Sequence, residues 1–315
     1  MNKTNIKLFA TLLISLAFLG GCKSDVEQAV SSPITQKPAV KDMSNSKQSG
    51  LEVSNSEQSK MEISKDVKVS FIFENSQVVL GEPVFLIFTV QNNLTQNIKL
   101  DLGRDRKEGF LFIVVFPDGR KVQLPQLSRG GIAIKGDLSI KPQQTYTQKV
   151  LLNQWIEFSS PGKYSLEAQL ANPIKVEDGK TISTESGFNA TLDVNPRDPE
   201  QLKKVSELLI QRIIESTSYE EAADAALALS YINDPVAIPY LQRALTSNQM
   251  VEPIIIKGLE RIKDKSSVQV LINIINEKPN SETAALAKTA LKKIESQSSD
   301  PKVKQMIKAV FLNKS

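Results

Sequence analysis

Few residues of this chain have types and spacing that could perform chemistry. Glu220, Glu221 and Asp224 form an acidic group, and a glycoside hydrolase needs paired carboxylates at a defined separation. These three residues lie at the start of a predicted helix, where acidic side chains are expected simply because they offset the helix dipole. Hydrolysis would also require a deep pocket lined by two close acids, one with a raised pKa. We therefore expect no enzyme activity and assign no catalytic residue.

Histidine is absent from the sequence, and Cys22 is its one cysteine. The lack of histidine excludes His-based catalytic triads, Cys–His dyads and His-ligated zinc or iron sites. A single thiol also excludes an internal disulfide bond. We predict no metal site and no cofactor.

Cys22 follows a segment that is typical of an export signal. Two lysines precede an apolar run over residues 8–18, which is shorter than the ~20 apolar residues that a transmembrane helix needs. A positive segment, a short apolar core and small residues at its end together indicate a signal peptide. We predict that this signal covers residues 1–21 and is cleaved between Gly21 and Cys22.

Leu19-Gly20-Gly21-Cys22 resembles the lipobox of bacterial lipoproteins. The resemblance implies that the Cys22 thiol receives a diacylglyceryl group and that the new amine is usually acylated. Two or more chains hold a protein firmly at a membrane, whereas one does not. Lys23 follows the cysteine, and by resemblance to enterobacterial sorting this favours the outer membrane, facing the periplasm or the cell surface. An ordinary secretory signal with a chance cysteine is the alternative.

Residues 22–66 have the composition of a spacer. They are rich in Ser, Gln, Asn, Lys and Glu, and their apolar residues are isolated, so the segment cannot bury enough apolar surface to fold. We predict a disordered tether. The whole chain has 39 Lys and Arg against 35 Asp and Glu, a net charge of +4. Because the lysines are scattered among acids, we expect no nucleic-acid partner.

Residues 67–194 are expected to form an antiparallel β-sandwich. Short apolar or alternating runs separated by turn residues are typical of such a fold, and we count about eight strands. The clearest runs cover residues 67–73, 84–90, 110–116, 121–124, 145–152, 163–170 and 188–194.

Two motifs in this region carry a resemblance to immunoglobulin-like domains. Pro161-Gly162-Lys163-Tyr164 opens a late strand and resembles the penultimate strand of those domains, where such a Tyr forms a corner. Gly81-Glu82-Pro83-Val84, with Asn92-Asn93 after its strand, resembles the early strands of bacterial immunoglobulin-like modules. The resemblance implies an immunoglobulin-like sandwich and does not identify a ligand.

Three further features of the β region each have two interpretations. Trp155 and Phe158 stand beside a turn, and we favour packing under it over a sugar-stacking platform. The charged run over residues 104–108 is expected to be a solvated loop, with a binding loop as the alternative. Arg129-Gly130-Gly131 is expected to be a mobile loop, since no strand and helix flank it as they would a phosphate site.

Residues 195–199 form a predicted linker, because two prolines disfavour a continuing strand. From 200 to 315 the apolar spacing is helical. A first helix over 200–216 is expected to cap the stack with polar residues on its outer face. Its apolar stripe is Leu202, Val205, Leu208, Leu209 and Ile213. Further helices are predicted over residues 219–232, 237–246, 251–262, 267–276, 282–296 and 301–312.

The predicted helices repeat in pairs. The Leu229-x-x-Ile232 pattern recurs at Leu259 and Leu291, and Asp234-Pro235 reappears as Asp300-Pro301. Residues 225–241 resemble a HEAT-like repeat of the short type found in phycobilin lyases and many bacterial scaffolds. This implies an α-solenoid, but nothing marks a chromophore site, so lyase activity does not carry over. In such repeats the second helix of each pair lines the concave face, here the helices around Gln242, Asn273 and Lys308.

The expected fold is therefore multidomain, an all-β sandwich followed by an all-α solenoid. Both are recurrent binding scaffolds. We expect a membrane-anchored, non-catalytic scaffold for protein–protein interactions in the bacterial cell envelope, with an unidentified envelope protein as partner. Individual contact residues do not follow from the sequence. The alternatives are an envelope glycan-binding or glycan-hydrolysing protein, an inhibitor of an extracytoplasmic protease, and a passive structural spacer.

Overall fold

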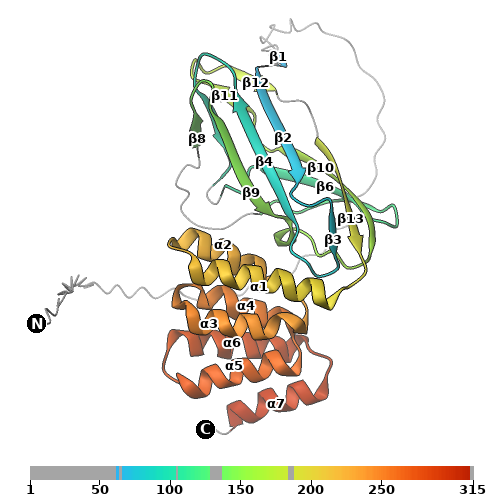
Figure 1. Cartoon of the computed structure of the whole chain (residues 1–315), viewed down its shortest axis with the longest axis vertical. Helices are drawn as coiled ribbons and strands as arrows, with labels where there is room; N and C mark the ends of the chain where they lie inside the picture. The colour runs from blue at the N-terminus through green and yellow to red at the C-terminus, as the bar shows by residue number, and fades with distance from the viewer. Residues whose placement is uncertain (1–61, 64–65, 104–105, 128–136, 184–187, 313–315) are drawn as a thin grey trace, which may run out of the picture. The chain divides into compact units, whose positions relative to one another are not determined.

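The computed structural model describes residues 62–63, 66–103, 106–127, 137–183 and 188–312 (Figure 1). All of them belong to one compact unit, in which a β region is followed by a helical region. The predicted cleavage and lipidation site at Gly21 and Cys22, nearly all of the predicted tether and the Arg-Gly-Gly segment over 129–131 lie outside the described residues.

The strands of the β region form three hydrogen-bonded sheets. One sheet has the order β3-β13-β10-β6-β7, with bounds Gln77–Val79, Phe188–Asn195, Gly162–Leu170, Phe110–Val115 and Lys121–Gln123. A second has the order β2-β4-β9, with bounds Val67–Phe73, Phe85–Asn92 and Thr145–Leu151. The third has the order β1-β12-β11-β5-β8, with bounds Glu62–Ile63, Thr181–Ser183, Ile174–Val176, Ile98–Asp101 and Asp137–Ile140.

Aromatic side chains join the first two sheets across a shared core. β4 alternates buried and half-buried residues along its length, because successive side chains of a strand point to opposite faces. The Phe110 ring of β6 lies 5.8 Å from the Phe71 ring of β2 and 5.0 Å from the Phe88 ring of β4. All three rings are buried, so this layer of rings is the centre of the β region.

The seven strands predicted from clear sequence patterns all form, each within two residues of the expected bounds. The pairing differs from the prediction in one respect. Among the described strands, β1 pairs with β12 and β3 pairs with β13 in parallel, so the region is rich in antiparallel pairs without being wholly antiparallel. β1 also lies within residues 22–66, the range predicted as a spacer.

Tyr164 fixes the turn that precedes β10. Its side chain is buried to 1% exposure, and its hydroxyl donates a hydrogen bond to the carbonyl oxygen of Ser160 at 2.8 Å. Its ring also meets that of Phe158 edge to face at 5.1 Å. A buried tyrosine needs a partner for its hydroxyl, and the backbone four residues upstream supplies it. The turn is thereby tied to the start of the strand.

Seven α-helices follow within the described residues, as the apolar spacing predicts. Their bounds are Pro199–Glu215 (α1), Tyr219–Ser230 (α2), Ile238–Ser247 (α3), Glu252–Ile262 (α4), Lys265–Glu277 (α5), Glu282–Gln297 (α6) and Pro301–Leu312 (α7). Side chains of Asp198, Ser218, Asp264 and Ser281 accept backbone N–H bonds at four of the helix starts. These caps satisfy donors that the first turn leaves unpaired.

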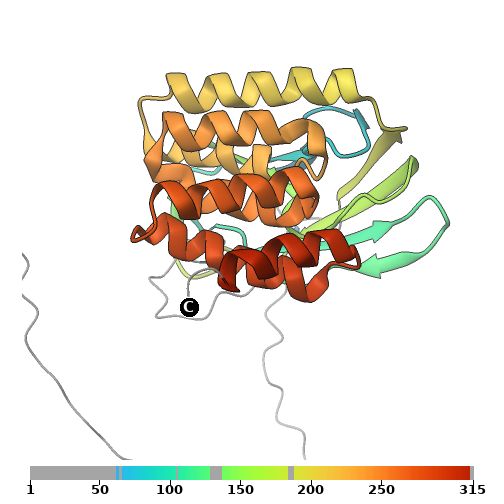
Figure 2. The same ribbon diagram turned by 90° about the horizontal axis from the view of Figure 1, so that it is seen from below.

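The helices stack in two layers. α2, α4 and α6 contact one another in succession, and so do α1, α3, α5 and α7; Figure 2 shows them side by side. The repeated leucines Leu229, Leu259 and Leu291 all have 0% exposure, because each faces the neighbouring layer. No helix could bury its apolar face without its neighbours.

The outer face of α1 differs from the prediction. Leu208, expected in the buried stripe, is 59% exposed, and Ile214 is 48% exposed. Ile210 is buried instead. The stripe follows the helical period of 3.6 residues, which places Leu209, Ile210 and Ile213 against the core and leaves Leu208 outside it. The outer face of α1, which was expected to carry polar residues, therefore also carries two exposed apolar side chains.

Candidate functional site

A short, well-anchored junction joins the β region to the helices. β13 ends at Asn195 and α1 begins at Pro199, so the predicted linker is shorter than residues 195–199. Arg197 donates two hydrogen bonds to the carboxylate of Asp234, one of them from Nη2 at 3.0 Å. Asp234 also accepts the N–H of Val236 at 2.9 Å. The Asp-Pro pair that the sequence repeats therefore both caps a turn and holds the junction.

The Arg197 guanidinium keeps the pKa of Asp234 below its ordinary value, although partial burial of the carboxylate opposes this effect. Asp234 is 6% exposed. A charge so far from water needs a partner, and Arg197 is the cation that faces it. Breaking this pair would leave an uncompensated carboxylate beside the junction.

The turn between β3 and β4 packs on α1. Gly81 has a φ of +94°, and a Cβ added to it would lie 3.6 Å from the Leu202 side chain. Burial raises the pKa of the neighbouring Glu82, while hydrogen bonds from the Val79 N–H and the Gln201 side chain oppose the rise. Val79 and Phe85 also pack against the core of the helices. The two regions thus share apolar and polar contacts.

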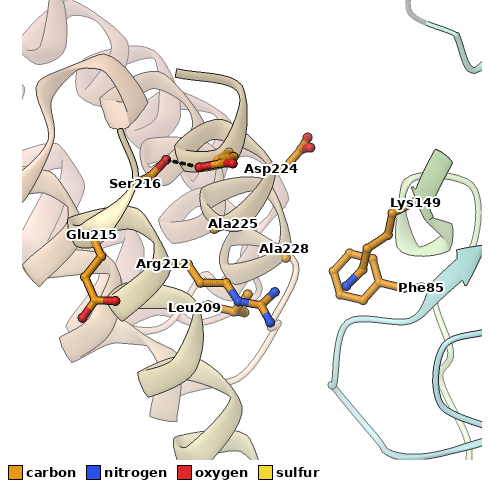
Figure 3. Close-up of a pocket in the computed structure, with 10 residues that line it drawn as sticks. Phe85, Lys149, Leu209, Arg212, Glu215, Ser216, Asp224, Ala225 and Ala228 are labelled. Atoms are coloured by element: carbon orange, nitrogen blue, oxygen red, sulfur yellow. Dashed lines mark hydrogen bonds between the residues drawn. The ribbon is translucent and has the colours of Figure 1, made fainter. Parts of the chain in front are cut away.

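A cavity of about 390 Å³ opens beside these contacts. Strands β4 and β9 supply Phe85 and Lys149 to one wall. The opposite wall is formed by α1, α2 and the turn between them: Leu209, Arg212, Glu215, Ser216, Glu221, Asp224, Ala225 and Ala228 (Figure 3). We call this cavity the junction cleft. Its alanines have short side chains, which leaves room between α2 and the strands.

Some charges of the junction cleft already have partners. Lys149 pairs with Glu74 at 2.6 Å and lies 3.9 Å from the centre of the Phe85 ring. Glu221 accepts a hydrogen bond from Ser216 at 3.1 Å. Within the described residues, by contrast, the side chains of Arg212 and Asp224 make no hydrogen bond or ion pair. Among the described residues, the cleft therefore presents a cation, Arg212, and an anion, Asp224, that have no hydrogen bond or ion pair.

The structure separates the acidic group considered in the sequence. Glu221 and Asp224 line the cleft, whereas Glu220 does not. Burial in the cleft raises the pKa of Asp224, with Glu220 adding to the rise and Lys107 and Lys149 opposing it. The Asp224 side chain nevertheless stays exposed at the rim. Sequence reasoning explained these acids by the helix dipole, and it missed the cleft because its other wall comes from distant strands.

The remaining features of the β region that the sequence singled out point to packing. Trp155 is 7% and Phe158 is 8% exposed, and Trp155 meets Phe112 edge to face at 5.3 Å. Neither ring offers a face to a sugar, which agrees with the favoured interpretation. In the charged run, residues 104–105 are outside the described residues. Lys107 donates to the side chain of Gln154 at 3.2 Å, so part of the run contacts its own domain.

The described part of the chain contains no helix long and apolar enough to cross a membrane. It also contains no group of three or more Cys, Asp or Glu side chains placed to hold a metal ion.

Residues 206–308 match the family model for HEAT repeats. The match runs from within α1 to within α7. HEAT-like repeats in the carboxy-terminal region, predicted from the segment over 225–241, are confirmed. A search of curated proteins finds no match to the chain.

Several solved structures share weak similarity with the chain. The ApaA protein from Bordetella pertussis is 11% identical with a TM-score of 0.26, over 41% of this chain and 91% of that one. Spo0M, a sporulation control protein from Bacillus subtilis, is 14% identical with a TM-score of 0.23, over 46% of this chain and 55% of Spo0M. A β-glucosidase from Listeria innocua is 11% identical with a TM-score of 0.23, over 42% of this chain and 16% of the enzyme. Likenesses this weak carry no argument about fold or function.

Proposed function

We propose that this protein is a lipid-anchored, non-catalytic scaffold that binds another protein of the bacterial cell envelope. The observation that supports this most is the stack of seven described helices, which matches HEAT repeats over 206–308. Stacked repeats of this kind present an extended concave surface on which partners bind. On this proposal the contact surface is the layer with Gln242, Asn273 and Lys308, which belong to α3, α5 and α7.

The β region is proposed to be an immunoglobulin-like sandwich that carries the helical stack. The strand orders β2-β4-β9 and β3-β13-β10-β6-β7, the parallel pairing of β3 with β13 and the hydrogen bond from Tyr164 to Ser160 support this assignment. A tyrosine that bonds back to the backbone before the penultimate strand is a hallmark of that fold. The third sheet is an addition to it.

Anchoring at Cys22 is proposed from the amino-terminal pattern alone. Cells fed an alkyne fatty acid should incorporate the label into the protein, and Cys22→Ala should abolish the label. An unlabelled wild-type protein in the membrane fraction would contradict lipidation. If the anchor sits in the outer membrane, the labelled protein should fractionate with it.

In-cell cross-linking of a carboxy-terminally tagged chain, followed by mass spectrometry of detergent-solubilised membranes, tests the scaffold proposal. We expect one specific envelope protein that is lost with Cys22→Ala. Lys308→Glu should also reduce its yield, whereas Lys292→Glu, on α6 in the other layer, should not. If the yield of the partner were unchanged in Lys308→Glu, the assignment of the contact surface to α3, α5 and α7 would be contradicted. If no partner were recovered at all, a passive spacer or a glycan ligand would be favoured.

One observation favours a second candidate, the hydrolysis of envelope glycans. Asp224 has a raised pKa and lines the same cleft as Glu221, and a general acid of a glycosidase needs a raised pKa. Release of soluble fragments from purified cell-wall glycan, abolished by Asp224→Asn, would establish this activity. The protease-inhibitor alternative has no supporting contact in the described residues and is tested by assaying envelope proteases with the purified chain.

A further inference from the structure

The junction cleft combines groups that a single small ligand could engage together. Arg212 on α1 extends towards Phe85, and Asp224 stands on the neighbouring helix α2 (Figure 3). Neither side chain makes a hydrogen bond or ion pair within the described residues, although Lys107 and Lys149 act on the Asp224 carboxylate at longer range. Between Arg212 and Asp224 lies an apolar floor that includes Leu209, Ala225 and Ala228. The cleft therefore offers a cation, an anion and an apolar surface.

Each of these groups selects one part of a ligand. A guanidinium presents parallel N–H donors that match a carboxylate in a bidentate geometry. A free aspartate carboxylate accepts hydrogen bonds from an ammonium group. The floor and the Phe85 ring would cover apolar carbon, which gains free energy when it leaves water. A molecule that satisfies all three has a carboxylate, an amine and an apolar body.

The size of the cleft limits the ligand to a small molecule. Its volume of about 390 Å³ lies at the lower end of the ~300–1,000 Å³ that ligand pockets span. Lys149 is not expected to add a second anion site, since it is already paired with Glu74 at 2.6 Å. Glu215 and Glu221 line the cleft as well, so the local charge favours a ligand that carries an amine over a simple anion.

We propose that the junction cleft binds a short apolar peptide with both termini free. Arg212 holds its carboxylate, Asp224 holds its amine, and the apolar floor and Phe85 hold its side chains. This site lies between α1, α2 and the β region, so it does not include Gln242, Asn273 or Lys308, which are assigned to a protein partner. It depends neither on that partner nor on the lipid anchor.

Calorimetric titration of the full chain with the dipeptide Leu-Leu tests the proposal. We expect saturable binding that weakens at least tenfold when the ligand is N-acetylated, and likewise when its carboxylate is replaced by an amide. Gly-Gly should bind more weakly than Leu-Leu, because it covers little of the apolar floor. Equal affinity for all four compounds would overturn the assignment of the two charged contacts.

Two variants connect each contact to its side chain. Arg212→Gln should weaken Leu-Leu binding at least tenfold yet leave the amide derivative unaffected, because that ligand no longer has the group that Arg212 holds. Asp224→Asn should also weaken Leu-Leu binding at least tenfold. It should leave binding of the N-acetyl derivative unaffected, because that ligand lacks the amine that Asp224 holds. Lys204→Gln, which removes an exposed cation from the same helix α1 outside the cleft, is the matched control. All three positions are exposed, and circular dichroism checks that each variant folds. Absence of binding by the folded wild-type chain, or an equal loss in Lys204→Gln, would overturn the proposal.

Discussion

The β region and the helical region build their cores over different distances along the chain. In the β region Leu86 pairs with Val150, and Val79 pairs with Asn195, so residues far apart in sequence meet. In the helical region each helix mainly contacts the next one or the one after it. Contacts between neighbours can be lost one repeat at a time, whereas long-range pairing holds or fails together. We expect the β region to unfold as one unit and the helices to unfold in steps.

The largest effect is expected from Phe88→Ala in the β region. Phe88 has 0% exposure and meets Phe71, Phe110 and Tyr146, so its removal leaves a cavity that should lower the free energy of unfolding by about 3–5 kcal/mol. Urea unfolding checks the value. Hydrogen exchange should rise in all strands of the two main sheets together. Ile72→Ala, at a site that is 58% exposed, is the control and should change little.

A smaller and more local effect is expected from Gly258→Val in α4. A Cβ at this position would lie 2.9 Å from the Ser230 Cα of α2, so the two helices must move apart, at a cost of about 1–3 kcal/mol. Hydrogen exchange should rise in α2 and α4 and stay unchanged in the β region. Lys257→Val, which is exposed on the same helix, reports the helix propensity of valine alone. A uniform rise across both regions would contradict stepwise unfolding.

A third prediction concerns the junction itself. Asp234→Asn removes the charge that Arg197 pairs with, and because Arg197 is half exposed we expect a loss of only about 1 kcal/mol. Asp300→Asn is the matched control. Asp300 caps α7 through the Lys302 N–H at 2.8 Å, as Asp234 caps its own turn, and Asn caps about as well as Asp.

The same pair should make stability depend on pH. The native pKa of Asp234 lies below its ordinary value of 3.8, so its contribution is complete above that value and is lost as pH falls through the native pKa. Glu82, whose pKa is raised by burial, acts in the opposite sense. Because Glu82 titrates in both proteins, its effect cancels in the difference in unfolding free energy between wild type and Asp234→Asn. This difference, measured as a function of pH, is therefore the test. A difference that does not shrink in acid would contradict the ion pair.

An effect of similar size to that of Asp234→Asn is expected from Tyr164→Phe. The variant keeps the buried ring and loses the hydrogen bond to the Ser160 carbonyl, which should cost about 0.5–1.5 kcal/mol. Thermal unfolding measures the change. Since the bond lies in the β region, the loss should appear in every strand of the two main sheets. A loss confined to the turn before β10 would indicate that this region also unfolds in parts.

The helical region could be predicted closely from the sequence, because the 3.6-residue period persists over whole helices. Caps at Ser218 and Ser281, which accept backbone N–H bonds, mark helix starts in the sequence. Leu208 was misplaced because an apolar residue at the edge of a stripe can face either way. The sequence patterns missed the short described strands β1, β3, β5, β8, β11 and β12, since a strand of two to four residues is too short to show alternation.

The junction cleft could not be predicted from the sequence. Phe85 and Lys149 come from two strands, and Arg212 and Asp224 come from two helices. These four residues have no regular spacing in the sequence. They come together only because Val79, Gly81 and Glu82 contact the helices. The acids on α2 carried a local signal in the sequence, whereas Arg212 on α1 carried none.

The placement of β13 has a mechanical consequence. It is hydrogen-bonded to β10 on one side and to β3 on the other, and it continues through Pro196, Arg197 and Asp198 into α1. Tension applied to the helices would therefore pull along the axis of a strand that is held at both edges, so its hydrogen bonds would share the load in shear instead of opening one after another. Under tension the helical stack would therefore extend before the β region, which would stay folded at forces that already separate the helices.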